Sequence, residues 1–248
     1  MLNMIRGEKL KYNRSFSKKL VIIAPLFFII YGLITIKQIN SQYNYFEYTV
    51  FNWWPLLFMP MGITLISSLS AHREKKAGRY IGLFSHDISK YNMWLSKVGV
   101  IALYVLISTV ELIGVLILLK IIIPNSITSI GNVTKASIVI WVTSLSFIPI
   151  ALFLAEKFGM VVSIIVNILG IVAGVICATE PSWIFIPWSW AMRLMCPIVK
   201  VHPNGIPLEP NSYLLDSTVI FKGIVVSILA FIILSLLTGI WFRNKEVK

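Results

Sequence analysis

The chain has 248 residues, of which 57% are hydrophobic and only 13% charged, and its mean hydropathy is +0.84. An ordinary soluble domain is about 45–50% apolar and about 25% charged, so this composition excludes a soluble enzyme, a disordered chain and a disulfide-stapled secreted module. The net charge of +12 would suggest a nucleic-acid partner in a soluble chain, but here the basic residues flank long apolar runs. Membrane topology and anionic lipid headgroups explain the charge, and no nucleic acid is expected.

Six apolar runs are long enough, or nearly so, to cross about 30 Å of hydrocarbon as helices. They are residues 20–36, 53–71, 98–123, 136–155, 160–179 and 218–241. No small-x-small cleavage site follows the first run, so a membrane span is expected there rather than a signal peptide. The sequence therefore predicts an all-α, polytopic membrane protein with six transmembrane helices.

The segments between the runs predict the orientation. Sixteen of the 22 basic residues lie in residues 1–19, in residues 72–97, in the turn after the fourth run and in the tail 242–248. Because short cytoplasmic loops are enriched in Lys and Arg, both termini are predicted to be cytoplasmic. Apolar residues interspersed among the cations of 1–19 predict an amphipathic helix at the inner surface.

The outer segment between the fifth and sixth runs, residues 180–217, has an unusual composition. It holds six of the eleven prolines and three of the eight tryptophans. It is too rich in proline for a seventh span and too apolar for a free loop. We expect short helical pieces that dip into the outer leaflet and pack on protein.

The sequence offers little that could support catalysis. No glycine-rich phosphate loop with its Lys-Ser/Thr is present, so the chain is not expected to bind ATP by itself. Cys177 and Cys196 match no metal-ligand spacing. They would form a disulfide only if both faced outward, and two incidental thiols are favoured. We predict neither an enzyme nor a bound cofactor or metal.

Two of the predicted spans carry polar residues. In the third, Tyr104, Ser108 and Glu111 share one helix face. That face would line a transport pathway or a moving helix interface, or Glu111 would simply be a protonated carboxyl hydrogen-bonded within the bundle. In the fifth, Ser163, Asn167, Gly170 and Gly174 form a stripe of small and polar residues, which favours close helix packing, either within the chain or against a second subunit.

The segment after the second run carries a first resemblance. It begins His-Arg-Glu-Lys-Lys-Ala-Gly at residues 72–78, continues with Leu-Phe at 83–84, and ends at Lys97. This resembles permeases of ABC-2-type ABC transporters, in which an acid-basic-x-x-Gly stretch forms a cytoplasmic connecting helix that meets the ATPase subunit. The resemblance implies that residues 72–97 form that helix. It assigns ATPase coupling to Arg73, Glu74, Gly78 and Lys97.

A second resemblance extends over nearly the whole chain. It rests on Asn-Trp-Trp at 52–54, the stretch 149–159, Asn167, Pro-Trp-Ser-Trp at 187–190 with Arg-Leu-Met at 193–195, and His-Pro-Asn-Gly at 202–205. Together these motifs are similar to the lantibiotic-immunity ABC permeases of the MutE/EpiE kind from Gram-positive bacteria.

That resemblance implies partners, a cargo and a location in the bacterial cytoplasmic membrane. Such permeases pair with a second, homologous permease and two copies of a separate ATPase, which binds the ATP and Mg. The complex expels cationic lanthionine peptides from the membrane. The residues expected to form the outer gate are Trp183, Trp188, Trp190, Arg193, His202 and Asn204.

Other interpretations stay open on the sequence. The outer segment could cap the bundle against water instead of gating it, because interfacial tryptophans are common anchors. The cargo could be another drug or a lipid. From a different class, the chain could be a nonenzymatic membrane anchor or sensor.

Overall fold

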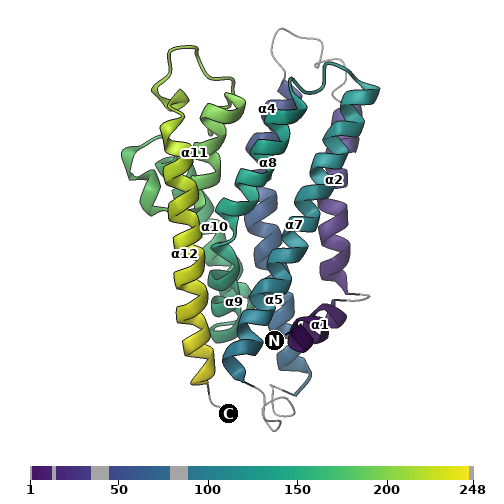
Figure 1. Cartoon of the computed structure of the whole chain (residues 1–248), viewed down its shortest axis with the longest axis vertical. Coiled ribbons are helices and arrows are strands. Elements are labelled where there is room, and N and C mark those ends of the chain that lie inside the picture. The colour runs from purple at the N-terminus through teal and green to yellow at the C-terminus, as the bar shows by residue number, and fades with distance from the viewer. Residues whose placement is uncertain (1, 13–14, 35–44, 79–88, 246–248) are drawn as a thin grey trace.

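The structure is a computed structural model, and it describes residues 2–12, 15–34, 45–78 and 89–245. Within these residues the regular elements are helices, and they run roughly along the long axis of an elongated bundle (Figure 1). The N-terminus and the C-terminus lie at the same end of the bundle, which we call the terminal end. The opposite end is called the distal end.

Six helical stretches in the described chain are long and apolar enough to cross a membrane. They are Phe16–Ile34 (α2), Tyr45–Lys76 (α4, a π-helical turn and α5), Lys90–Ile122 (α7), Ile130–Lys157 (α8 and α9), Met160–Cys177 (α10) and Thr218–Arg243 (α12). This confirms the predicted all-helical fold with six spans. A short helix, Leu2–Lys11 (α1), precedes them.

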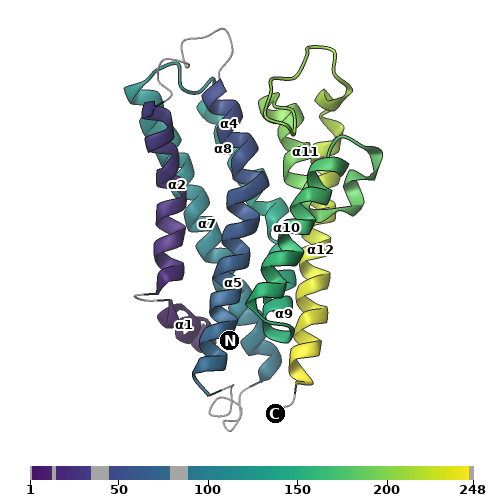
Figure 2. The same ribbon diagram turned by 180° about the vertical axis from the view of Figure 1, so that it is seen from behind.

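The six spans are unequally buried within the bundle. In an apolar 18-residue window of each span, 67% of the residues in Ile130–Lys157 and 61% in Tyr45–Lys76 are buried, against 17% in α10 and 22% in α12. Helix α7 packs against α2, α8 and α12, while α5 packs against α9 and α10 (Figure 2). Helices α2, α10 and α12 therefore form the periphery, where their apolar side chains suit contact with lipid.

The second span is longer than the predicted 53–71 and changes its winding partway. Helix α4 covers Tyr45–Trp53, a π-helical turn covers Trp54–Phe58, and α5 covers Met59–Lys76. Pro55 and Pro60 fall at the starts of the last two segments and lack the N–H that a regular α-helix needs, so the hydrogen-bond pattern shifts locally. The added N-terminal turns bury Glu47, whose carboxylate accepts from the Thr128 backbone N at 2.7 Å.

The fourth span is broken where one helix, 136–155, was expected. Helix α8 covers Ile130–Ser144 and α9 covers Phe147–Lys157. Pro149 has no N–H for the carbonyl of Leu145, which accepts instead from Ile148 N at 3.1 Å. That tighter i→i+3 bond changes the helix direction at this point.

Two segments predicted to be single helices are divided in the structure. Residues 1–19 contain α1, which ends at Lys11, and the first turn of α2, which begins at Phe16. Ser15 starts α2, because its hydroxyl accepts from Lys18 N. In the predicted connecting helix 72–97, residues up to Lys76 continue α5 and those from Lys90 begin α7. Residues 79–88, which include Leu83 and Phe84 of the resemblance, lie outside the described residues.

The outer segment has short helical pieces, as its proline content indicated. They are Pro181–Phe185, Pro187–Val199 (α11) and Tyr213–Leu215, with one isolated bridge between Val201 and Pro207. Helix α11 packs against α8, α10 and α12 at the distal half of the bundle (Figure 2).

Candidate functional site

A buried lysine lies at the centre of a charge cluster at the terminal end. Lys97, near the start of α7, has only 2% of its surface exposed. Its Nζ lies 2.7 Å from Glu74 Oε1 at the end of α5 and 3.2 Å from Glu8 Oε2 on α1. A lysine is rarely this buried without ionic partners, and here two carboxylates from two other helices supply them.

A second lysine completes the network. Lys11 Nζ lies 2.6 Å from Glu8 Oε1 and 2.6 Å from Glu74 Oε1. Burial lowers the pKa of Lys11, but the carboxylates of Glu8 and Glu74 outweigh this effect and raise it above its usual range. Each acid is therefore shared by two ammonium groups, and three of the four ion pairs join α1, α5 and α7 to one another, while the fourth lies within α1.

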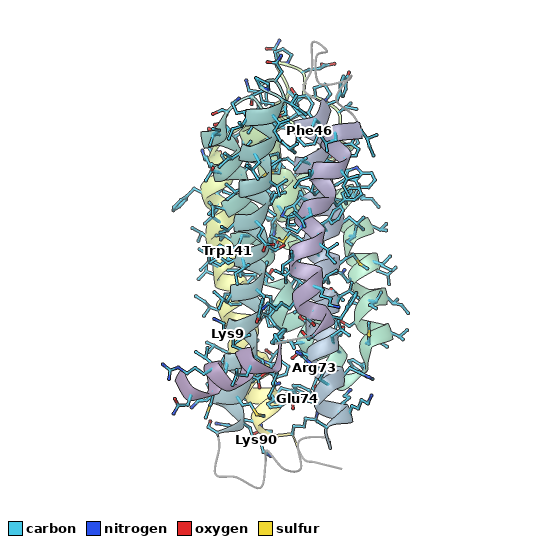
Figure 3. The ribbon with its side chains drawn as sticks, turned by 90° about the vertical axis from the view of Figure 1, so that its right-hand side faces the viewer. Lys9, Phe46, Arg73, Glu74, Lys90 and Trp141 are labelled. Atoms are coloured by element: carbon cyan, nitrogen blue, oxygen red, sulfur yellow. The ribbon has the colours of Figure 1, made fainter. Side chains whose placement is uncertain are left out.

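Arg73 and two tyrosines extend the cluster. The guanidinium of Arg73 donates to the carbonyl of Lys11 and lies 4.3 Å over the ring of Tyr12, which is 4.7 Å from the ring of Tyr104. Burial raises the pKa of Tyr12 to about 12, which keeps its phenol neutral. Figure 3 shows Arg73 and Glu74 near α1 at the terminal end, far from Phe46.

The other ion pair in the described chain lies at the same end. Lys245, just after α12, pairs with Glu156 near the end of α9. Lys90 Nζ, at the start of α7, donates to the carbonyl of Lys245 at 2.9 Å. These contacts thus join α9 and α12 to α7 on one side, and the cluster joins α1 and α5 to α7 on the other.

Such a network can transmit a displacement between helices. Separating buried opposite charges leaves each without compensation, which costs several kcal/mol per pair, about 3–5 kcal/mol in measured cases. A force applied to α5 or α1 at this end is therefore carried to α7, because the cluster resists opening. No group of three His, Cys, Asp or Glu side chains that could hold a metal occurs in the described residues.

The predicted coupling residues fall into two groups in this geometry. Glu74 and Lys97 are inside the cluster and Arg73 is half-buried against Tyr12, so the contacts described for these side chains lie within the chain. Gly78 is exposed, with φ +98°. Sequence reasoning missed Glu8 and Lys11. The available signal was that Glu8 is the only acid among the six basic residues of 1–19.

The polar face predicted on the third span is built into the packing of α7. Tyr104 stacks on Tyr12, as described, and the Ser108 hydroxyl donates to the carbonyl of Val21 at 2.9 Å. That carbonyl lacks its helical partner because Pro25, four residues later, has no N–H. For Glu111, one carboxyl oxygen is buried without a hydrogen-bond partner.

The small-residue stripe on α10 packs within the chain. A Cβ on Gly170 would lie 2.3 Å from the Trp188 ring, and one on Gly174 would lie 2.7 Å from the Trp188 backbone. The Trp188 indole N–H donates to Asn167 Oδ1 at 2.8 Å, and its ring stacks on Phe147 at 5.4 Å. Of the two alternatives for this stripe, the structure shows packing against α11.

The residues predicted for the outer gate mostly face inward. Trp183 and Trp190 are 8% and 3% exposed, and buried Arg193 donates to the Leu214 carbonyl at 2.8 Å. His202 Nδ1 accepts from Asn204 N within a turn that contains Gly205 at φ +90°. That turn is held to the second span by Asn52, whose amide donates to Pro203 O at 2.7 Å.

The two cysteines that could have formed a disulfide do not. Cys177 and Cys196 are free thiols, and Cys196 is buried. Burial raises the pKa of the Cys196 thiol to about 11.

The comparison with protein families identifies the kind of protein to which this geometry belongs. The model described as "ABC-2 family transporter protein" matches residues 4–174, more than two thirds of the chain. No curated protein and no solved structure matches. The match includes the terminal-end cluster, the first four spans and most of the fifth, and it implies an ABC ATPase as partner. The chain therefore belongs to the ABC-2 transporter family, as a multi-pass permease component that in bacteria resides in the cytoplasmic membrane.

Proposed function

We propose that this chain is the permease subunit of an exporter that expels cationic lanthionine peptides from the membrane, giving immunity or resistance to them. A transport role follows from the family. The peptide cargo is supported by the sequence motifs at 187–190 and 202–205, which are similar to those of lantibiotic-immunity permeases. Another drug or a lipid is an equally open cargo.

The observation that carries the mechanism is the charge cluster at the terminal end. The ATPase subunit binds at this end, which is cytoplasmic in the proposal, and contacts the exposed residues after Glu74. Movement of that contact is passed through Glu74 to Lys97 and Glu8, so α5, α7 and α1 move as one unit. Glu74 and Lys97 then serve coupling from inside the chain, without touching the ATPase.

The outer segment is assigned a supporting role in this proposal. Trp188 packs on α10 and on Phe147 of α9, and Arg193 donates to the Leu214 carbonyl in the 3₁₀ turn before α12. These contacts hold the distal half of the bundle together. Any first contact with a peptide falls to exposed side chains of the same segment, such as Phe185, which is 81% exposed, and Tyr213, which is 70% exposed.

The test is to express the chain with its ATPase and second permease and to measure co-purification and peptide resistance. Lys76→Glu reverses an exposed charge in the proposed ATPase contact, and we expect it to reduce both ATPase recovery and resistance about tenfold, which corresponds to about 1.4 kcal/mol. The matched control is Lys157→Glu, also exposed at the terminal end but at the end of α9. It should leave both readouts unchanged.

Three outcomes would contradict the proposal in different ways. Equal recovery of the ATPase with both variants would place its binding surface elsewhere. The complex could also recover the ATPase normally but confer resistance to an unrelated drug and none to lanthionine peptides. That result would show that the chain is a permease with a different cargo. Failure of the wild-type chain to bring down any ATPase would favour the anchor or sensor.

A further inference from the structure

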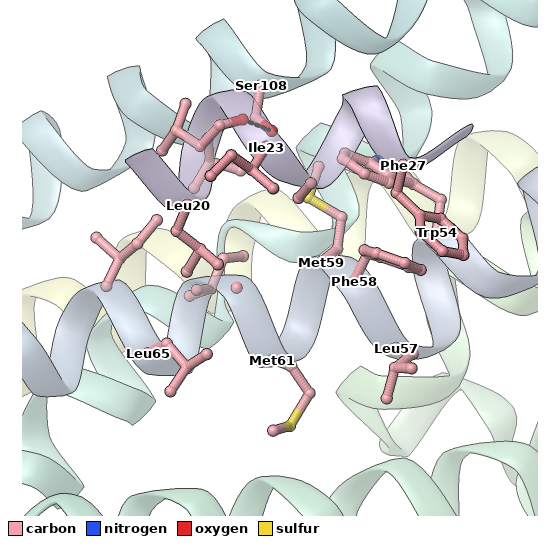
Figure 4. A pocket seen from close by; sticks show the side chains of 16 residues that line it. Leu20, Ile23, Phe27, Trp54, Leu57, Phe58, Met59, Met61, Leu65 and Ser108 are labelled. Carbon is pink, nitrogen blue, oxygen red and sulfur yellow. Dashed lines mark hydrogen bonds between the residues drawn. The ribbon is translucent and has the colours of Figure 1, made fainter. Parts of the chain in front are cut away.

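An elongated cavity lies between α2 and the second span, away from the charge cluster. Its volume is about 450 Å³, within the ~300–1,000 Å³ usual for ligand pockets. Its walls are almost wholly apolar, with Leu20, Ile23 and Phe27 on α2 and residues from Trp54 to Ile66 on the second span. Figure 4 shows Phe27 of α2 beside Trp54 and Phe58 at one side of the cavity, and Leu20 of α2 toward the other side.

The shape of this cavity is that of a groove open to the side. Helix α2 packs along α7 but touches α5 only sparsely, which leaves the space between them. Three lining residues are also on the outer surface of the bundle, because Ile23, Phe27 and Leu57 are 59%, 41% and 43% exposed. The distal end is closed by aromatic rings, since Phe27 and Phe58 are 5.4 Å apart and Trp54 and Phe58 are 5.8 Å apart.

The length of the groove matches one leaflet of a bilayer. Trp54 and Ile66 are twelve positions apart on a helical stretch, which at 1.5 Å per residue spans about 18 Å. Half of a hydrocarbon core of about 30 Å is about 15 Å. An acyl chain that entered at the terminal end would therefore reach the aromatic rings near the middle of the membrane.

Positive charge lies at the terminal end of the groove. Lys18 and Lys19 are exposed at the start of α2, and Lys19 is one turn below Ile23 on the same side of the helix. Neither lysine takes part in the ion pairs of the described chain, which use Lys11, Lys97 and Lys245. Basic residues beside a gap between transmembrane helices are a recognised arrangement for anionic lipid headgroups.

We propose that this groove binds one acyl chain of an anionic glycerophospholipid from the leaflet at the terminal end, with the lipid phosphate held by Lys18 and Lys19. The apolar walls, the length of one leaflet and the cations at one end together fit an amphiphile with a negative head. The lipid fills the space between α2 and α5 and so supports the contact of α2 with the rest of the bundle. This role is independent of the transported cargo.

Gly62 provides a variant that fills the groove without disturbing its walls. It lines the cavity, and a Cβ added there meets nothing within 4 Å. Gly114, in the middle of α7, is equally free of contacts but does not line the cavity. Gly62→Leu and Gly114→Leu therefore form a matched pair with the same gain in helix propensity.

The experiment extracts each full-length variant from vesicles of equal dioleoyl-phosphatidylglycerol and dioleoyl-phosphatidylcholine, and counts retained lipids by native mass spectrometry. We expect wild type and Gly114→Leu to retain one phosphatidylglycerol and Gly62→Leu to retain about tenfold less, which is about 1.4 kcal/mol. Lys18→Gln and Lys19→Gln should each lower the preference for phosphatidylglycerol over phosphatidylcholine about fivefold. This is expected because each basic residue near the membrane surface contributes about 1 kcal/mol to the attraction of an anionic lipid.

Three results would overturn the proposal. The first is equal lipid retention by Gly62→Leu and Gly114→Leu. The second is retention of both lipids in equal amounts by wild type. The third is a loss of dimers, with no loss of lipid, in Gly62→Leu alone, which would show that a second copy of the chain occupies the groove.

Discussion

At the scale of single residues, the proline within α2 is matched by a side chain that satisfies the backbone carbonyl it leaves open. Pro25 lies inside α2 and leaves the carbonyl of Val21 without its i+4 donor, and Ser108 on α7 supplies that donor at 2.9 Å. An unsatisfied carbonyl in a membrane is costly, because no water is available to replace the missing bond. Ser108 was predicted to line a transport pathway or a helix interface, and its hydroxyl makes this contact at the interface of α7 with α2.

We therefore predict that Ser108 and Pro25 are coupled. Ser108→Ala should destabilise the protein by about 1–3 kcal/mol, because the Val21 carbonyl then has no partner. In a Pro25→Ala background the residue-25 N–H returns to that carbonyl, so the same serine substitution should cost less than about 0.5 kcal/mol. Thermal unfolding in detergent of the two single variants and the double variant measures the coupling energy. Additive effects would show that the two residues act independently.

At the scale of elements, the contact between α10 and α11 depends on glycines. The Trp188 ring lies over Gly170 and the Trp188 backbone over Gly174, so no side chain fits at either position, and the indole N–H donates to Asn167. The same small residues would permit a contact with another subunit, which is why the sequence left both alternatives open. In the structure, Trp188 of α11 occupies the surface that these small residues form on α10.

Gly170→Ala is predicted to destabilise the packing of α11 on α10. Its Cβ would lie 2.3 Å from the Trp188 ring, so the ring must move, and overpacking of this kind costs about 1–3 kcal/mol. Gly114→Ala, which meets nothing within 4 Å, should be neutral or stabilising by up to about 1 kcal/mol, because alanine favours the helix. Thermal unfolding compares the two. Equal melting temperatures would refute the close approach of Trp188.

At the scale of the whole molecule, the ion pairs of the described chain gather at the terminal end. Lys97 with Glu8 and Glu74 joins α1 and α5 to α7, and Lys245 with Glu156 joins α12 to α9. The distal half is joined by apolar packing and by single hydrogen bonds such as that of Asn52 to Pro203. We infer that the terminal end is the more rigid one, which suits the end at which an ATPase applies force.

A neutral substitution in the cluster should loosen one end of the molecule only. Glu8→Gln keeps the size of the side chain but removes one of two negative charges that face Lys11 and Lys97. We expect faster amide hydrogen exchange in α1 and in the first turns of α7, by about tenfold for each 1.4 kcal/mol of lost stabilisation. Helix α11, at the distal half, should exchange at its wild-type rate and is the internal control. A uniform increase throughout the chain would contradict the local role of the cluster.

The sequence alone determined the number of spans. A helix that crosses the hydrocarbon core needs apolar side chains along its length, so each span is visible in the sequence as a continuous apolar run. Even there, proline effects on geometry were missed: the break before Phe147 and the π-helical turn at Trp54–Phe58 fall inside runs that look uniform by hydropathy. Local apolarity determines that a segment crosses the membrane, whereas its winding depends on which backbone groups find partners.

The contacts that form the candidate site were decided by the tertiary structure. Glu8 and Lys97 are 89 positions apart, and Ser108 is 87 positions from Val21, whose carbonyl it satisfies. A single sequence shows that Glu8 is an isolated acid among cations and that Pro25 interrupts a helix, but it does not say which helix supplies the partner. That choice depends on which helices are neighbours, and helix neighbours in a membrane are selected by side-chain fit and polar satisfaction, because apolar faces alone gain little by leaving lipid.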